Sequence, residues 1–212
     1  MPISNISKKT ALHMRENLNL SEDQEEIAAY GFEMILHNSL TLGIIILAGW
    51  LLGCLSAALT ATFAASVLRA LSGGAHSESA ANCSLISVVL AILIGKTAIT
   101  FGSQIPLPAT ILVLSLISLI SLKVIWVLAP VDSPAKPITN EIHRKNLRAL
   151  SLVAVTIISA VQLSLTILNP GFFAPYALAV SLGVVWQTFT LTAAGHRFSK
   201  RLDYLINKLK RR

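Results

Sequence analysis

The chain has 212 residues, of which 54% are apolar and 13% are charged, and its mean hydropathy is +0.69. These values lie outside the usual range for a soluble globular domain, so we expect one all-α domain embedded in a membrane. The net charge of +7 comes from basic residues at the ends of apolar segments, without interleaved aromatic residues. This pattern argues against nucleic acid as a partner and favours anionic lipids and an acidic peptide.

The first 26 residues are polar and lack the apolar core and small-residue cleavage site of a secretory signal peptide, so we expect the mature chain to start at Met1. Ser21 followed by Gln24 has the spacing of a capping box, which predicts the start of a helix. We expect residues 1–34 to form peripheral cytoplasmic helices, the last of which continues into the first membrane segment.

The apolar stretch of residues 35–70 decides the number of crossings. Basic residues gather in the loop before residue 147 and at the C-terminus, which places both on the cytoplasmic side by the positive-inside rule. Arg69 and His76 then also fall on the cytoplasmic side, so a cytoplasmic N-terminus requires an even number of passes before Arg69. We therefore predict helices at residues 35–52 and 54–70 with a turn near Gly53. One long tilted helix with an external N-terminus is the alternative.

Four further crossings follow. Residues 84–131 carry only two charges, Lys96 and Lys123, and can cross twice at about 20 residues per pass. Residues 147–168 and 172–194 supply two more, which makes six in total. Lys96 lies within an apolar run, where an ionisable group often marks a functional site, but a short helix also lets it extend to the outer interface.

The membrane segments of residues 35–194 are followed by a basic amphipathic stretch, residues 195–212. Apolar side chains recur there at helical spacing from Phe198 to Leu209, and lysines and arginines fill the other face. This pattern is typical of a helix on the cytoplasmic leaflet. An anchoring role is sufficient to explain it, with substrate recognition as the alternative.

Between two predicted membrane segments lie His76 and Cys83, a candidate base and nucleophile. A thiolate attacks, and a nearby imidazole can accept the thiol proton and later protonate the leaving amine. Along one continuous helix the two would be about 10 Å apart, beyond hydrogen-bond reach. Gly73 and Gly74 therefore predict a chain reversal that folds His76 over the first turn of a helix containing Cys83.

Ser77 and Ser79 are possible caps of that helix, and a position near its N-terminus favours the thiolate of Cys83. Spacing alone also allows a simpler interpretation, because free cysteines are commonly small buried apolar residues. We assign Cys54, within an apolar run, to packing. Two cysteines are too few for a disulfide framework, and no spacing indicates a metal or another cofactor.

Two motifs together resemble the accessory gene regulator B (AgrB) family. One is Arg-x-x-x-Gly-Gly-x-His at residues 69–76, with Cys83 after it, and the other is Ala-Pro-Val-Asp-Ser-Pro-Ala-Lys-Pro-Ile at residues 129–138. The resemblance covers most of the chain. It implies an integral membrane cysteine endopeptidase of a Gram-positive bacterium that processes the precursor of a cyclic autoinducing peptide in quorum sensing, with Cys83 and His76 as the catalytic pair.

The reaction implied by the resemblance conserves the energy of the cleaved peptide bond. The thiolate releases the C-terminal tail of an AgrD-type precursor and holds the rest as a thioester, which an internal cysteine or serine attacks to close a thiolactone or lactone ring. Such a site must exclude water. We expect it near the cytoplasmic face of the cell membrane, with the precursor and membrane lipids as partners, and a homodimer by analogy with common oligomers.

Arg69 and Gly74 also match family positions. Arg69 either steers an acidic substrate segment or anchors a helix end. Lys136 lies between prolines that restrict the backbone, so it either recognises the peptide or signals topology. Glu78 or Asn82 is a candidate third group to orient the imidazole.

Two non-enzymatic functions remain open at this stage. A transporter would use the short helices and Lys96 to line a substrate route, and a scaffold would bind the precursor without cutting it. Both tolerate serine or alanine at Cys83, whereas a nucleophile does not. Export of the cyclised peptide is compatible with the enzyme as a second activity.

Overall fold

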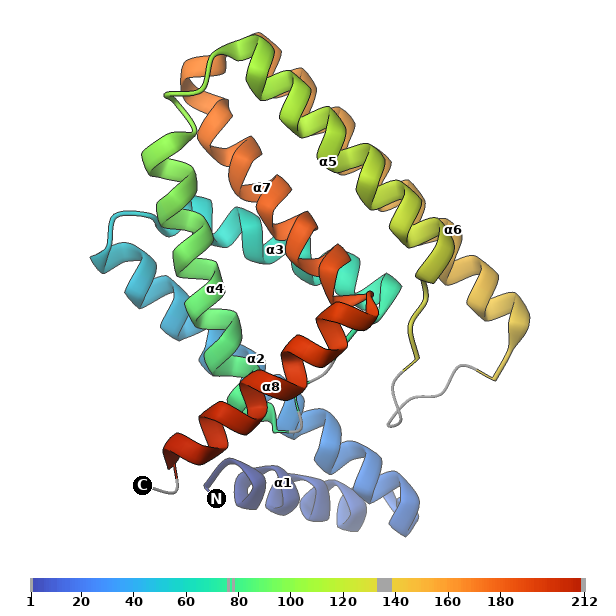
Figure 1. The fold of residues 1–212 in the computed structure, drawn as a ribbon. Helices are drawn as coiled ribbons and strands as arrows, with labels where there is room; N and C mark the ends of the chain where they lie inside the picture. Colours follow the sequence, from blue (N-terminus) through green and yellow to red (C-terminus); the bar gives the residue numbers. More distant parts are fainter. Residues whose placement is uncertain (1, 76, 78, 133–138, 211–212) are drawn as a thin grey trace.

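A computed structural model describes residues 2–75, 77, 79–132 and 139–210, and within these ranges the chain is helical with no strand. Six helices, α2 to α7, are long and apolar enough to cross a membrane. The predicted all-α fold, with six membrane helices and a further helix at each end, is therefore confirmed (Figure 1). In chain order the helices are α1 (Pro2–Leu18), α2 (Glu22–Leu51), α3 (Leu55–Ser72), α4 (Ala80–Phe101), α5 (Leu107–Leu128), α6 (Glu141–Leu168), α7 (Pro170–Thr190) and α8 (Ala193–Lys210).

The start of α2 has the predicted capping box. The amide of Gln24 donates to the hydroxyl of Ser21 at 3.3 Å, and the amide of Ser21 donates to the side chain of Gln24 at 2.9 Å. Both bonds satisfy donors that lack a partner within the helix. Arg15 of α1 then joins the two helices by donating to Glu25 at 2.7 Å and to Glu22 at 3.3 Å, and these bonds raise the pKa of Arg15 above its ordinary value.

The stretch after residue 35 forms two helices, as predicted. Gly53 lies between α2 and α3 with φ of +66°, a conformation that glycine adopts with little strain. Lys96 of α4 is exposed and extends to this turn, where its ammonium donates to the carbonyl of Leu52 at 3.1 Å. It thus satisfies an acceptor at the C-terminal end of α2.

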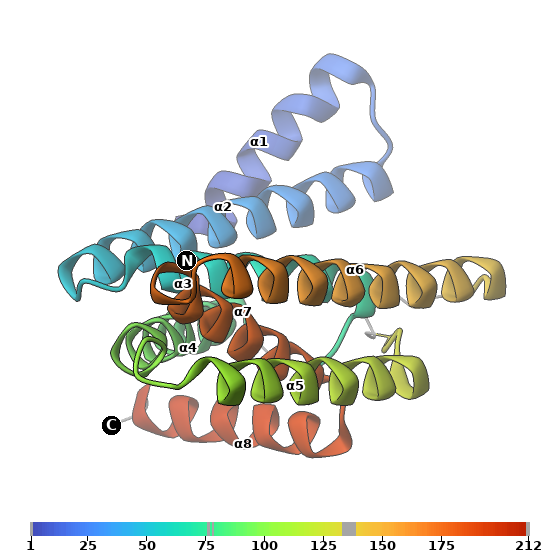
Figure 2. The same ribbon diagram turned by 90° about the horizontal axis from the view of Figure 1, so that it is seen from above.

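Helix α7 is the centre of the bundle. It contacts α3, α4, α5 and α6, and 56% of its apolar window is buried, against at most 33% for the other five membrane helices. Close packing depends on small residues, since a Cβ atom at Gly183 would lie 2.6 Å from the carbonyl oxygen of Ala61 in α3. Figure 2 shows the α1–α2 hairpin and α8 on opposite sides of this bundle.

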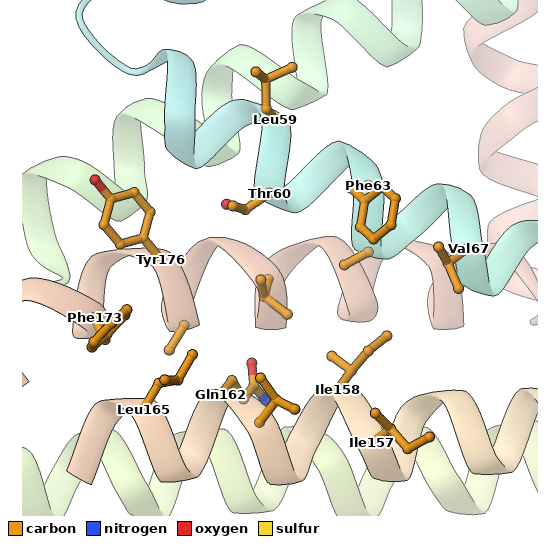
Figure 3. A pocket seen from close by; sticks show the side chains of 14 residues that line it. Leu59, Thr60, Phe63, Val67, Ile157, Ile158, Gln162, Leu165, Phe173 and Tyr176 are labelled. Carbon is orange, nitrogen blue, oxygen red and sulfur yellow. The ribbon is translucent and has the colours of Figure 1, made fainter. Parts of the chain in front are cut away.

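A cavity of about 600 Å³ lies between α3, α6 and α7, and its lining is almost entirely apolar (Figure 3). Gln162 of α6 contributes an amide there, and its side-chain oxygen accepts a bond from Ser181 at 3.1 Å. Arg69, Gly74 and Cys83 do not line this cavity. It is therefore separate from the described residues that the sequence identified as candidates for the active site.

Candidate active site

The loop between α3 and α4 begins with the two glycines that predicted a chain reversal. Gly73 has φ of +67° and Gly74 has φ of +133°, where a side chain would be strained. Neither glycine has room for a side chain. A Cβ atom at Gly73 would collide with the carbonyl oxygen of Val131, and one at Gly74 would lie 2.5 Å from the hydroxyl of Thr190. Backbone strain and close contact each require glycine, in agreement with the predicted turn, whereas the position of His76 relative to α4 stays a prediction.

The second motif of the sequence, after α5, lies against the first. Gly73 and Val131 form a parallel β-bridge, and the amide of Val131 donates to the carbonyl of Ser72 at 2.9 Å. Arg148 of α6 holds the same segment by donating to the carbonyl of Ala129 at 2.6 Å. The two stretches that carry the family resemblance therefore meet at one end of the bundle.

The C-terminal end of α7 fixes the loop from another side. The buried amide of Gln187 donates to the carbonyl of Gly73 at 2.7 Å and to the hydroxyl of Ser72 at 3.2 Å. The carbonyl of Thr190 accepts from the amide of Ala75 at 2.9 Å. Sequence reasoning missed both residues, although a glutamine deep in an apolar helix is a signal of buried hydrogen bonding.

Arg69 lies in the last turn of α3 and is directed back to the loop. Its guanidinium donates to the carbonyl of Ala75 at 2.7 Å. Ala75 precedes His76 in the chain, so this bond ties the end of α3 to the backbone beside the predicted base. The contact is the one expected of a residue that anchors a helix end.

Cys83 lies in the first turn of α4, as predicted. The hydroxyl of Ser79 caps this helix by accepting from the backbone amide of Asn82 at 3.2 Å. Cys83 is half-buried and lies one turn from the N-terminal end of α4. Cys54 is 1% exposed and packs in the interior, in agreement with its assignment to packing.

Three candidate residues, His76, Glu78 and Lys136, lie outside the described residues. The pairing of His76 with Cys83 therefore stays a prediction, as do the roles of Glu78 and Lys136. Among the residues that are described, no group of three or more His, Cys, Asp or Glu side chains is placed to hold a metal ion.

An unpredicted acidic residue approaches the loop from α8. Asp203 is 2% exposed. Its Oδ1 atom accepts from the hydroxyl of Ser77 and, at 3.1 Å, from the side-chain amide of Asn82. The same amide donates to Asn207 at 3.2 Å. The signal in the sequence was the presence of one acidic residue in an otherwise basic amphipathic helix, but an anchoring role explained that helix without it.

Comparison with known proteins agrees with the two motifs. Residues 7–191 match the accessory gene regulator B family. AgrB-like protein 2 of Clostridium perfringens (strain 13 / Type A) is 32% identical over 212 residues, which cover 98% of this chain and 99% of the relative. An AgrB-like protein of Clostridium perfringens (strain SM101 / Type A) is 31% identical over the same shares. No solved structure matches the chain.

A more distant relative, an AgrB-like protein of Halalkalibacterium halodurans, is 28% identical over 202 residues, or 94% of this chain and 92% of the relative. These relatives come from Gram-positive bacteria, and the six apolar helices indicate a multi-pass membrane protein. Membership of the matched family implies a role in processing an autoinducing peptide. Since the match includes both motifs and every membrane helix, the chain belongs to the accessory gene regulator B family.

Proposed function

We propose that this protein is an integral membrane cysteine endopeptidase that removes the C-terminal tail of an AgrD-type precursor, with Cys83 as nucleophile and His76 as base. The observation that supports it best is the position of Cys83 in the first turn of α4, at the end of a loop held by three other segments. A fixed loop lowers the cost of bringing a base and a nucleophile together.

The reaction proceeds in two acyl transfers. His76 takes the proton of the Cys83 thiol, and the thiolate attacks the carbonyl carbon of the scissile peptide bond. The carbon–nitrogen bond then breaks as the imidazolium protonates the leaving amine, which departs with the C-terminal tail. The rest of the precursor stays on Cys83 as a thioester. An internal cysteine or serine of the peptide gives its proton to His76, attacks the thioester and closes the ring, which releases Cys83.

Other candidate residues support this chemistry. Arg69 and Gly74 hold the backbone beside His76, and Lys136 offers a positive charge to an acidic part of the precursor. We place the site at the cytoplasmic face because the basic residues Arg144 and Arg148 of α6 lie at the same end of the bundle as the loop. Anionic lipid headgroups would contact the basic face of α8. A homodimer remains a proposal from analogy.

Mass spectrometry of an AgrD-type precursor incubated with the full chain in lipid vesicles tests the proposal. Wild type and Cys54→Ala should release the C-terminal fragment, whereas Cys83→Ala and His76→Ala should not. Cleavage by Cys83→Ala at the wild-type rate would exclude the nucleophile. If no protein cleaves although the wild type is folded and binds the precursor, a scaffold or a transporter takes the place of the peptidase.

A further inference from the structure

The C-terminal helix α8 reaches the candidate active site through a buried acidic residue. Asp203 is its only acidic residue, yet the side chain is 2% exposed and is directed away from the basic face. Moving a carboxylate out of water is costly unless several hydrogen bonds replace the lost hydration. A membrane-surface anchor has no need of such a group, since its lysines and arginines and its apolar face already provide binding.

The bonds of Asp203 join the loop to the start of α4. Its Oδ1 atom accepts from Ser77, which follows His76 in the chain, and from Asn82, which precedes Cys83. One oxygen atom thus links the neighbours of both predicted catalytic residues. Asn207, one turn further along α8, accepts from the same Asn82 amide at 3.2 Å and fixes its orientation.

We infer that Asp203 is a positioning residue of the peptidase, and this inference rests on the proposed function. Its carboxylate sets the separation between Ser77 and the helix turn that carries Cys83. Because one buried oxygen atom accepts both hydrogen bonds, loss of this side chain removes both contacts at once. A misplacement of about 1 Å in a catalytic group can reduce the rate by about 100-fold.

Helix α8 is also held at a second place. The anchoring of α8 and the positioning of the active-site loop can therefore be tested separately. Phe198 packs against Trp186 and Phe189 at the end of α7, with ring centroids 6.1 and 5.8 Å apart. Phe198 precedes Asp203 in α8, so this aromatic cluster is separate along the helix from the contacts of Asp203. Removal of the Phe198 ring should loosen the anchor of α8, whereas removal of the Asp203 carboxylate should disturb the active-site loop.

The matched family region ends at residue 191, before α8 begins. The positioning residue therefore lies outside the motifs from which the catalytic pair was identified. Asp203 contacts Ser77 and Asn82 because α8 lies close to the start of α4.

The test uses the full chain in vesicles with an AgrD-type precursor, and compares wild type, Asp203→Ala, Asp203→Asn, Phe198→Ala and Cys83→Ala. We expect Asp203→Ala to lower kcat by about 100-fold with little change in KM. Asp203→Asn keeps an oxygen at the same place and should recover part of that loss. Phe198→Ala should retain most of kcat. Tryptic cleavage at Arg201, which is exposed, reports whether α8 stays docked in each variant.

Several results would overturn the inference. These are an unchanged kcat in Asp203→Ala, a defect confined to KM, equal losses in the alanine and asparagine variants, or losses that only follow the release of α8. Failure of the proposed function has a different signature, namely that wild type does not cleave or that Cys83→Ala cleaves as well as wild type.

Discussion

Two connections between membrane helices in this protein contain glycine at positive φ, and each is followed by a cysteine, but they differ in their surroundings. The turn at Gly53 is open, because a Cβ atom there would meet nothing within 4 Å. The loop at Gly73 and Gly74 is enclosed by residues from α7 and from the segment after α5. At Gly53, glycine permits the turn of the chain. At Gly73 and Gly74, glycine also leaves room for atoms of Val131 and Thr190.

The two cysteines that follow these connections also differ in their surroundings. Cys54, beside the open turn, is 1% exposed. Cys83, after the enclosed loop, is half-buried at the start of a helix. A membrane protein can thus contain one inert and one candidate reactive thiol in similar sequence contexts, and the difference lies in what the preceding connection contacts.

The largest expected effect separates the cysteines. Replacement of Cys83 by alanine should reduce precursor cleavage by more than about 10³-fold, because no other group can form the thioester. Cys54→Ala should leave the rate within about two- to threefold of wild type, with a loss of stability of about 1 kcal/mol. Quantitative mass spectrometry of the released fragment measures both, and similar rates for the two variants would remove the functional distinction.

The next effect separates the glycines. Gly74→Ala introduces strain at φ of +133° and a contact 2.5 Å from Thr190, so we expect a loss of stability of about 3 kcal/mol and most of the activity. Gly53→Ala introduces strain alone at φ of +66° and should cost about 1 kcal/mol. Thermal unfolding in detergent and cleavage in vesicles provide the measurements. Equal effects would mean that the enclosure of the loop is unimportant.

A smaller effect concerns the hydrogen bonds that enclose the loop. Gln187→Ala leaves the buried acceptors at Gly73 and Ser72 without this donor and should cost about 2 kcal/mol. The matched control is Gln104→Ala, since Gln104 is exposed and donates only locally, to Thr100 at 2.6 Å. Denaturation of both variants checks the difference. A control as unstable as Gln187→Ala would argue against a specific role of the buried amide.

The smallest effect is expected at the open turn. Lys96→Gln weakens one exposed bond to Leu52 and should change stability by less than about 1 kcal/mol, with no change in cleavage. Transport assays with labelled peptide sharpen this prediction. Reduced movement of peptide across the membrane in Lys96→Gln would revive the hypothesis that Lys96 lines a substrate route.

The sequence by itself determined the helices and several of their ends. Apolar length predicted six membrane segments, and the caps at Ser21 and Ser79 and the break at Gly53 were all identified. These features depend on hydrogen bonds and backbone conformations within a few residues, so their causes are local. The motif with Gly73 and Gly74 predicted the reversal for the same reason.

Only the tertiary structure decided what surrounds the candidate active site. Gln187 lies 115 residues from Ser72, and Asp203 lies 126 residues from Ser77. In the sequence, Gln187 is a polar residue in an apolar segment and Asp203 is an acid in a basic helix, and neither pattern names a partner. Their partners follow from the packing of α7 against the end of α3 and from the approach of α8 to the start of α4, which depend on side-chain shape across the whole bundle.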